Sequence, residues 1–159
     1  MLNVNTSPEQ TLNLRPMDSS LAATNAPWRE KLASATADEI VGIKHAAVGG
    51  DEKWREHVAS IPKRVGCHFH KHGGEDYSIV QGSGVMHFGK VETIDGKPTV
   101  TSWLKLDVKT GDAFTIPEGY AHQLVSTGEK ELVIVFACPD SHLNDSQDRT
   151  ILANAPGVL

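Results

Sequence analysis

Two segments decide the fold of this chain: His68-Phe69-His70-Lys71-His72-Gly73-Gly74-Glu75 and Pro117-Glu118-Gly119-Tyr120-Ala121-His122. Together they supply imidazoles and a carboxylate, the donor types that suit a borderline divalent transition metal. Alternate side chains of an extended strand share a face, so His68, His70 and His72 are predicted to point the same way. Gly73-Gly74 allows a bend before Glu75. The first hypothesis is therefore a metal site built on strands.

Short runs rich in β-branched and aromatic residues follow one another from Ile61 onward, separated by Gly, Asp and Pro. The predicted strands are Arg64–His72, Tyr77–Gln81, Val85–Val91, Thr99–Leu106, Ala113–Ile116, Gln123–Ser126 and Leu132–Cys138. This spacing is typical of an all-β sandwich or barrel. Asp95-Gly96 predicts a hairpin turn, and the run Leu132–Cys138 is apolar on both faces, as in a strand buried between layers.

The first part of the chain reads differently. Residues 1–25 are polar and predict an N-terminal arm or edge strand, and residues 26–159 predict a single domain. Within that domain, Pro27–Leu32 predicts a short helix and Glu39–Val48 a strand. Asp51–His57 predicts a short charged turn or helical piece.

The two histidine-bearing segments resemble the paired motifs of the cupin superfamily. The motifs read His68-x-His70-x4-Glu75-x6-Gly82 and Gly111-x5-Pro117-x-Gly119-x2-His122. The family's early Gly falls on Pro62 here, and its closing Asn falls on Ser126. The likeness covers residues 61–139. It implies a cupin-type jelly-roll β-barrel or sandwich, to which this chain adds a short N-terminal extension with minor helix.

The resemblance implies four metal ligands: His68, His70, Glu75 and His122. Such a set leaves positions on the ion open for water or substrate. We expect one divalent transition metal (Fe, Mn, Ni, Zn, Co or Cu), and the residues do not choose among them. Because the ligands must be deprotonated, affinity should fall as the pH drops through the histidine range near ~6.5.

Three residues are candidates for the catalytic base: His72, Tyr77 and Glu118. His72 either lies beside the site or is exposed, and Tyr77 either donates a hydrogen bond into the cavity or packs as an aromatic residue. The polar stretch 138–149 predicts a solvated loop. The alternative is that it folds over the barrel mouth and brings His142 and Arg149 near a substrate.

The leading functional hypothesis is a metal-dependent isomerase or epimerase acting on a small oxygen-rich molecule, such as a sugar or hydroxy-ketone. The metal would acidify the α-proton and stabilise the enediolate. The alternatives are an iron(II) dioxygenase and a non-catalytic cupin that binds a small molecule. The cupin resemblance implies a fold and a metal, and does not select one reaction.

Composition sets the expected partners and location. A net charge of -5 argues against nucleic acid and anionic membranes, and no apolar stretch approaches the ~20 residues that span a bilayer. The start lacks a secretory pattern, so we expect a cytoplasmic protein with reduced thiols at its 2 cysteines. A homodimer is expected if the N-terminal strand crosses to a neighbour's sheet.

Overall fold

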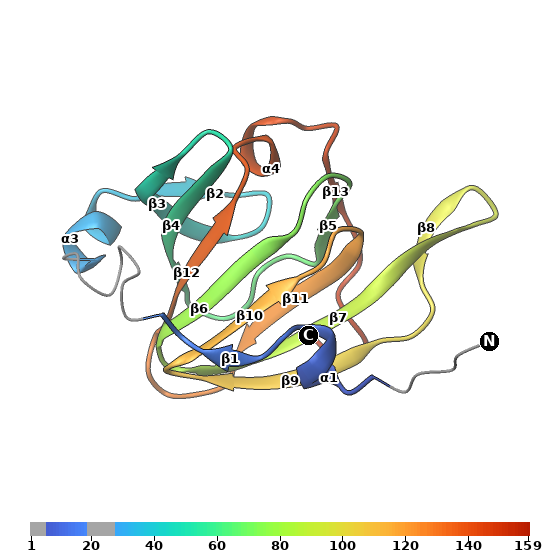
Figure 1. The fold of residues 1–159 in the computed structure, drawn as a ribbon, viewed down its shortest axis with the longest axis horizontal. Helices are drawn as coiled ribbons and strands as arrows, with labels where there is room; N and C mark the ends of the chain where they lie inside the picture. Colours follow the sequence, from blue (N-terminus) through green and yellow to red (C-terminus); the bar gives the residue numbers. More distant parts are fainter. Residues whose placement is uncertain (1–5, 19–27) are drawn as a thin grey trace.

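The computed structural model describes residues 6–18 and 28–159 of the chain. Two curled antiparallel sheets pack around a shared core (Figure 1). The first has the order β1 (Arg15–Pro16), β10 (Asp112–Ile116), β6 (Glu75–Gln81), β12 (Leu132–Cys138), β4 (Trp54–Ile61), β3 (Ile43–Asp51), β2 (Thr36–Asp38). The second has the order β13 (Arg149–Ile151), β5 (His68–His70), β11 (Tyr120–Ser126), β7 (Ser83–Ile94), β8 (Lys97–Val100), and β9 (Leu104–Lys109) also pairs with β7. The prediction of an all-β cupin fold is confirmed.

The described helices are short: α1 (Pro8–Thr11), α3 (Trp28–Ala33) and α4 (Ser141–Asn144). None of them is long and apolar enough to cross a membrane. Of the predicted arm, residues 1–5 and 19–25 lie outside the described residues. Its described part includes β1, which pairs with β10 at the edge of the first sheet.

The structure confirms two local predictions. β12 spans Leu132–Cys138 and is buried along its whole length. On its outer face Val133 and Val135 lie in a cluster that includes side chains of α3, and on its inner face Ile134 and Phe136 belong to the main core. The Asp95-Gly96 turn also appears: both residues have positive φ, and they join the antiparallel pair β7 and β8.

One local prediction is right in one of its two alternatives: Glu52-Lys53 forms the expected turn, but the helical piece is absent. Asp51–His57 contains no helical piece, because β4 already begins at Trp54 and forms a hairpin with β3. β4 is paired on both sides: with β12 from Arg55 to Ile61 on one side, and with β3 on the other. This pairing on both sides outweighs the polar local composition.

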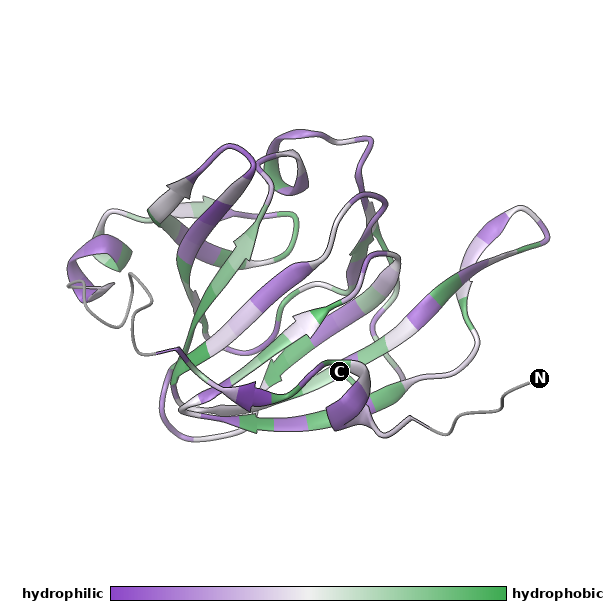
Figure 2. Ribbon diagram, in the orientation of Figure 1, coloured by the Kyte–Doolittle hydropathy of each residue, from purple (hydrophilic) through white to green (hydrophobic). Residues whose placement is uncertain are grey.

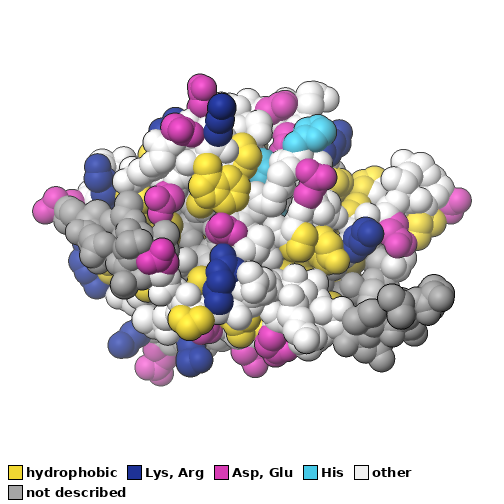
Figure 3. Space-filling view, in the orientation of Figure 1, with side chains coloured by type: hydrophobic (Ala, Val, Ile, Leu, Met, Phe, Trp, Pro, Cys, Tyr) yellow, Lys and Arg dark blue, Asp and Glu magenta, His cyan; other side chains and the backbone are white. Residues whose placement is uncertain are grey.

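Side-chain hydropathy follows the layers. Strands that face both core and solvent alternate between apolar and polar residues (Figure 2), and β9 shows this in its burial, with Leu106 and Val108 buried between exposed neighbours. On the face seen in Figure 3, acidic and basic side chains are interspersed, with apolar groups between them. The core between the sheets is therefore where the hydrophobic effect stabilises this fold.

The closing glycine of the first motif gives a stability test. Gly82 and Gly111 have nearly equal φ, +93° and +95°, in the left-handed region. A Cβ on Gly82 would lie 2.9 Å from the Glu131 carbonyl oxygen, whereas one on Gly111 would meet no heavy atom within 4 Å. We expect Gly111→Ala to cost about 1 kcal/mol of unfolding free energy. Gly82→Ala should cost roughly 2 kcal/mol more, because the backbone must also shift. Urea unfolding measures both, and equal losses would contradict the steric argument.

Candidate metal centre

The four residues of the two motifs come together from both sheets. His68 and His70 lie on β5, and His122 lies on β11, where it is the register partner of His68. Glu75 opens β6 in the opposite sheet. One donor atom from each lies within 4.8 Å of the others, and all four side chains are buried. The structure thus places the predicted ligands around one point between the sheets.

Hydrogen bonds orient each of the three imidazoles. The Nδ1 of His68 lies 2.7 Å from the Gly66 carbonyl oxygen, and the Nδ1 of His122 lies 3.1 Å from that of Tyr120. The Nδ1 of His70 lies 2.9 Å from Asp148 Oδ2. Because these oxygens only accept, each Nδ1 carries the proton, and a neutral ring then has its lone pair on Nε2.

The Nε2 atoms of His70 and His122 are directed toward Glu75. The Nε2 of His70 lies 2.9 Å from Glu75 Oε1, and the Nε2 of His122 lies 3.6 Å from Oε2. The latter nitrogen is buried and has no hydrogen-bond partner. A buried lone pair without a partner is costly, and a cation between these nitrogens and the carboxylate would satisfy it. The donor set therefore fits a divalent transition metal.

The pKa values of His68 and Glu75 are shifted in the directions that favour binding of a cation. Burial, and then the neighbouring His122, holds the pKa of His68 well below its ordinary value. Burial acts to raise the pKa of Glu75, but contacts with the imidazoles of His122, His142 and His70 hold it well below its ordinary range. Near neutral pH, His68 is therefore uncharged and Glu75 is ionised, as metal ligation requires.

His142 on α4 is a fifth titratable residue in the cluster. Its Nδ1 lies 3.2 Å from Glu75 Oε1, and its ring stacks on that of His70 with centroids 3.8 Å apart. His142 is 1% exposed, so this part of the stretch after β12 packs over the cluster, whereas residues 144–147 are exposed. The expectation of a solvated loop was wrong at His142, where the structure instead matches the alternative that this stretch folds over the barrel mouth. A polar stretch without periodicity gives no local sign that decides between the two.

The three base candidates lie in different surroundings. Tyr77 is buried and its hydroxyl donates to Glu75 Oε2 at 3.0 Å. Burial, and then the charge of Glu75, raises its pKa well above the ordinary value, so Tyr77 remains a hydrogen-bond donor. Glu118 is exposed, and its Oε2 accepts a hydrogen bond from the Gly73 N–H at 2.7 Å. It therefore joins two turns and lies outside the cluster.

His72 does not share the face of His68 and His70. The predicted strand Arg64–His72 is much shorter in the structure, where β5 ends at His70. Strand alternation ends there too, and the His72 side chain is exposed. Its backbone N–H instead donates to Asp148 Oδ1 at 2.9 Å.

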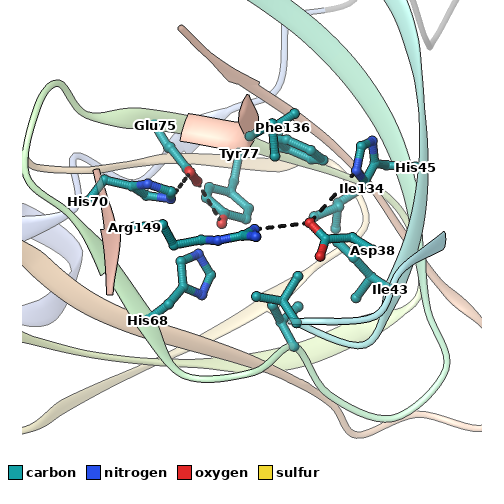
Figure 4. A pocket seen from close by; sticks show the side chains of 13 residues that line it. Asp38, Ile43, His45, His68, His70, Glu75, Tyr77, Ile134, Phe136 and Arg149 are labelled. Carbon is teal, nitrogen blue, oxygen red and sulfur yellow. Dashed lines mark hydrogen bonds and ion pairs between the residues drawn. The ribbon is translucent and has the colours of Figure 1, made fainter. Parts of the chain in front are cut away.

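A pocket opens beside the cluster. Its walls are mostly apolar, formed by Val41, Ile43, Val65, Ile134, Phe136 and Leu143. Asp38, His45 and Arg149 add polar groups that sequence reasoning did not assign, apart from the alternative placement of Arg149 near a substrate. Figure 4 shows the Arg149 side chain reaching across the pocket toward Asp38. The walls of the pocket are therefore mostly apolar, and a few polar groups converge on it.

Comparisons with known proteins agree with this architecture. A family model described as a polysaccharide biosynthesis C-terminal domain matches residues 44–150. No curated protein sequence matches significantly. Many solved structures are similar to this one.

Two structural neighbours show the level of likeness. A structure of CapF with the inhibitor 3-isopropenyl-tropolone has a TM-score of 0.56 and 18% identity, covering 76% of this chain and 34% of that one. A formate complex of Lactobacillus farciminis oxalate decarboxylase has a TM-score of 0.55 and 14% identity, covering 75% and 33%. The chain spans only about a third of either neighbour. These neighbours are cupin-fold proteins, and the likeness shows the fold alone.

A third neighbour has bound metal. A structure of Bacillus subtilis oxalate decarboxylase, described for its Mn(II) centres, has a TM-score of 0.51 and 16% identity. It covers 70% of this chain and 28% of that one. The present chain has a cupin fold with a His and Glu cluster able to hold a metal ion.

Proposed function

This chain belongs to the polysaccharide biosynthesis C-terminal domain family, and on that premise we propose that it is a metal-dependent enzyme acting on a sugar. The reaction we propose is isomerisation or epimerisation of a hydroxyl-bearing carbon beside a carbonyl. The observation that carries the proposal is the buried cluster of three imidazoles and one carboxylate, which borders an apolar pocket.

His68, His70, Glu75 and His122 would hold the ion. Three neutral imidazoles and one carboxylate leave a divalent ion with net positive charge. A bound ion would supply Lewis acidity to the carbonyl and hydroxyl oxygens of the substrate. The apolar walls of the pocket limit water around that point.

The residues around the cluster have separate roles in this proposal. The hydroxyl of Tyr77 donates a hydrogen bond to Glu75 Oε2 and so fixes the orientation of that carboxylate. Outside the cluster, Asp38 and His45 are the groups that line the described pocket and can accept a proton. Burial lowers the pKa of His45, so this imidazole is neutral near pH 7 and able to act as a base.

The test combines elemental analysis with solvent isotope exchange. Protein purified without chelators or an affinity tag should contain about one transition-metal ion per chain. In D2O, an isomerase or epimerase exchanges the α-proton of its sugar for deuterium, which NMR and mass spectrometry detect. Removal of the metal by a chelator should stop the exchange, and readdition should restore it. Oxygen consumption with iron(II), without exchange, would instead support a dioxygenase.

A non-catalytic sugar-binding cupin is the second candidate. The observation that favours it is that two of the three residues considered as bases, His72 and Glu118, are exposed. This candidate predicts saturable binding of a sugar with neither deuterium exchange nor a product under air or argon. The same D2O experiment therefore separates binding from turnover.

A further inference from the structure

A second cavity, the outer cavity, lies next to the pocket beside the cluster. The outer cavity is lined by Thr36, Ala37, Asp38, Glu39, Ile40, His45, Leu143 and Arg149. Four of these residues, Asp38, His45, Leu143 and Arg149, also line the inner pocket. They therefore stand between the outer cavity and the His68, His70, Glu75 and His122 cluster.

An ion pair lies between the pocket and the outer cavity, in the region that we call the passage. The Nη1 of Arg149 donates to Asp38 Oδ2 at 3.0 Å, and the Nε2 of His45 lies 4.0 Å from the same oxygen. Both partners of the ion pair are only 12% exposed. Arg149 lies on β13 and Asp38 on β2, which are edge strands of opposite sheets. The pair thus joins the two sheets at the entrance to the cluster.

Arg149 is close to the cluster along the backbone as well. It is the register partner of His70 in the antiparallel pair of β13 and β5. A ligand that reached the cluster through this passage would pass the guanidinium and the Asp38 carboxylate together. Recognition at this point therefore depends on what the two groups offer as a unit.

The pair offers donors and acceptors without net charge. A guanidinium has five N–H donors, and the hydrogen bond to Asp38 uses one of them. The carboxylate keeps further lone pairs free to accept. An anionic ligand that approached Arg149 would be repelled by the negative charge of Asp38 beside it. A hydroxyl group both accepts and donates, so adjacent hydroxyls match the pair without an uncompensated charge.

We propose that Asp38 and Arg149 determine specificity by recognising hydroxyl groups of an uncharged sugar unit whose other end lies at the His68, His70, Glu75 and His122 cluster. This inference rests on the proposed sugar substrate and adds the requirement that the recognised unit is neutral. It assigns a role to two residues that neither motif contains.

The test compares neutral sugars with their acidic counterparts. Glucose and galactose are titrated against metal-replete protein in parallel with glucuronate and galacturonate, and binding is followed by saturation-transfer NMR. The wild type should bind each neutral sugar about tenfold more tightly than its uronate. Asp38→Asn leaves Arg149 unbalanced and should reverse that preference. Arg149→Gln should weaken the neutral sugars about tenfold.

Two control substitutions show whether the change in sugar preference is specific to Asp38 and Arg149. Asp107→Asn on exposed β9 and Arg15→Gln on β1 repeat the two chemical changes away from the passage and should leave the preference unchanged. If Arg149→Gln fails to fold by circular dichroism, Arg149→Lys keeps the charge but loses the planar fork, and it should still weaken the neutral sugars.

The remaining outcomes separate this inference from the proposed reaction. Equal or tighter binding of uronates by the wild type, or an unchanged preference in Asp38→Asn, overturns the inference. No binding of any probe at full metal content overturns it together with the sugar substrate. The expected preference without deuterium exchange keeps the inference and overturns the isomerase.

Discussion

Replacing His122 with alanine is expected to lower bound metal from about one ion per chain to almost none, while the β-rich fold remains. His122 is the only ligand candidate that the second motif supplies, and its Nε2 is a buried nitrogen without a hydrogen-bond partner. Its removal leaves three donors from β5 and β6, and the ion loses its donor from β11. Losing a ligand should lower metal affinity by more than the roughly 10–100-fold loss caused by mutating a residue that hydrogen-bonds to a ligand.

The fold should survive this change. The backbone of β11 pairs with Phe88 on one side and with His68 on the other, and neither pairing needs the imidazole. His72→Ala is the matched control, because His72 belongs to the same histidine-rich segment but is exposed. Elemental analysis should find full metal content in His72→Ala. Retained metal in His122→Ala would refute the four-residue centre.

The sequence predicted the middle of this site better than its surroundings. The spacing of His68, His70 and Glu75 in one motif and His122 in the other identified the cluster. The register of β5 and β11 places His122 opposite His68, and Glu75 faces them from β6 in the other sheet. The apolar run at β12 and the Asp95-Gly96 turn were equally informative, because burial on both faces and positive φ leave local signs.

What the sequence did not predict depends on contacts between distant segments. Asp148 reaches the cluster from a polar stretch that looks like a solvated loop, as does His142, which only the alternative prediction placed there. Asp38 reaches the adjoining pocket from a three-residue edge strand. Local periodicity cannot report which edge strand lies opposite which. The prediction that His72 shares a face with His68 and His70 also failed. Alternation of side chains holds only while the strand continues, and β5 ends at His70.

Asp148 provides the second large prediction, since it lies directly behind a candidate ligand. It is 1% exposed. Its Oδ2 accepts from the Nδ1 of His70 and its Oδ1 accepts from the His72 N–H, both at 2.9 Å. The carboxylate thus fixes the tautomer of His70 that presents the Nε2 lone pair to a metal. It also fastens the backbone where the strand ends.

Asp148→Asn keeps the shape but cannot keep both hydrogen bonds. If the amide oxygen accepts from the His72 N–H, the amide NH2 faces His70 Nδ1, and the imidazole proton must move to Nε2, where it opposes metal binding. If the amide is turned around, the NH2 faces the His72 N–H instead, and two donors meet. Either arrangement is unfavourable, so we expect metal affinity to fall about 10–100-fold.

Competition against a chelator of known affinity measures this loss, with Asp107→Asn as the control for the same chemical change on the exposed side of β9. Asp148→Asn should still bind about one ion per chain when metal is in excess, because all four donors remain. His122→Ala should not, because a donor is missing. Weakened affinity at full stoichiometry in one variant and lost stoichiometry in the other would therefore distinguish a residue that orients a ligand from the ligand itself. Equal affinity in Asp148→Asn and the wild type would mean that the tautomer of His70 does not depend on this carboxylate.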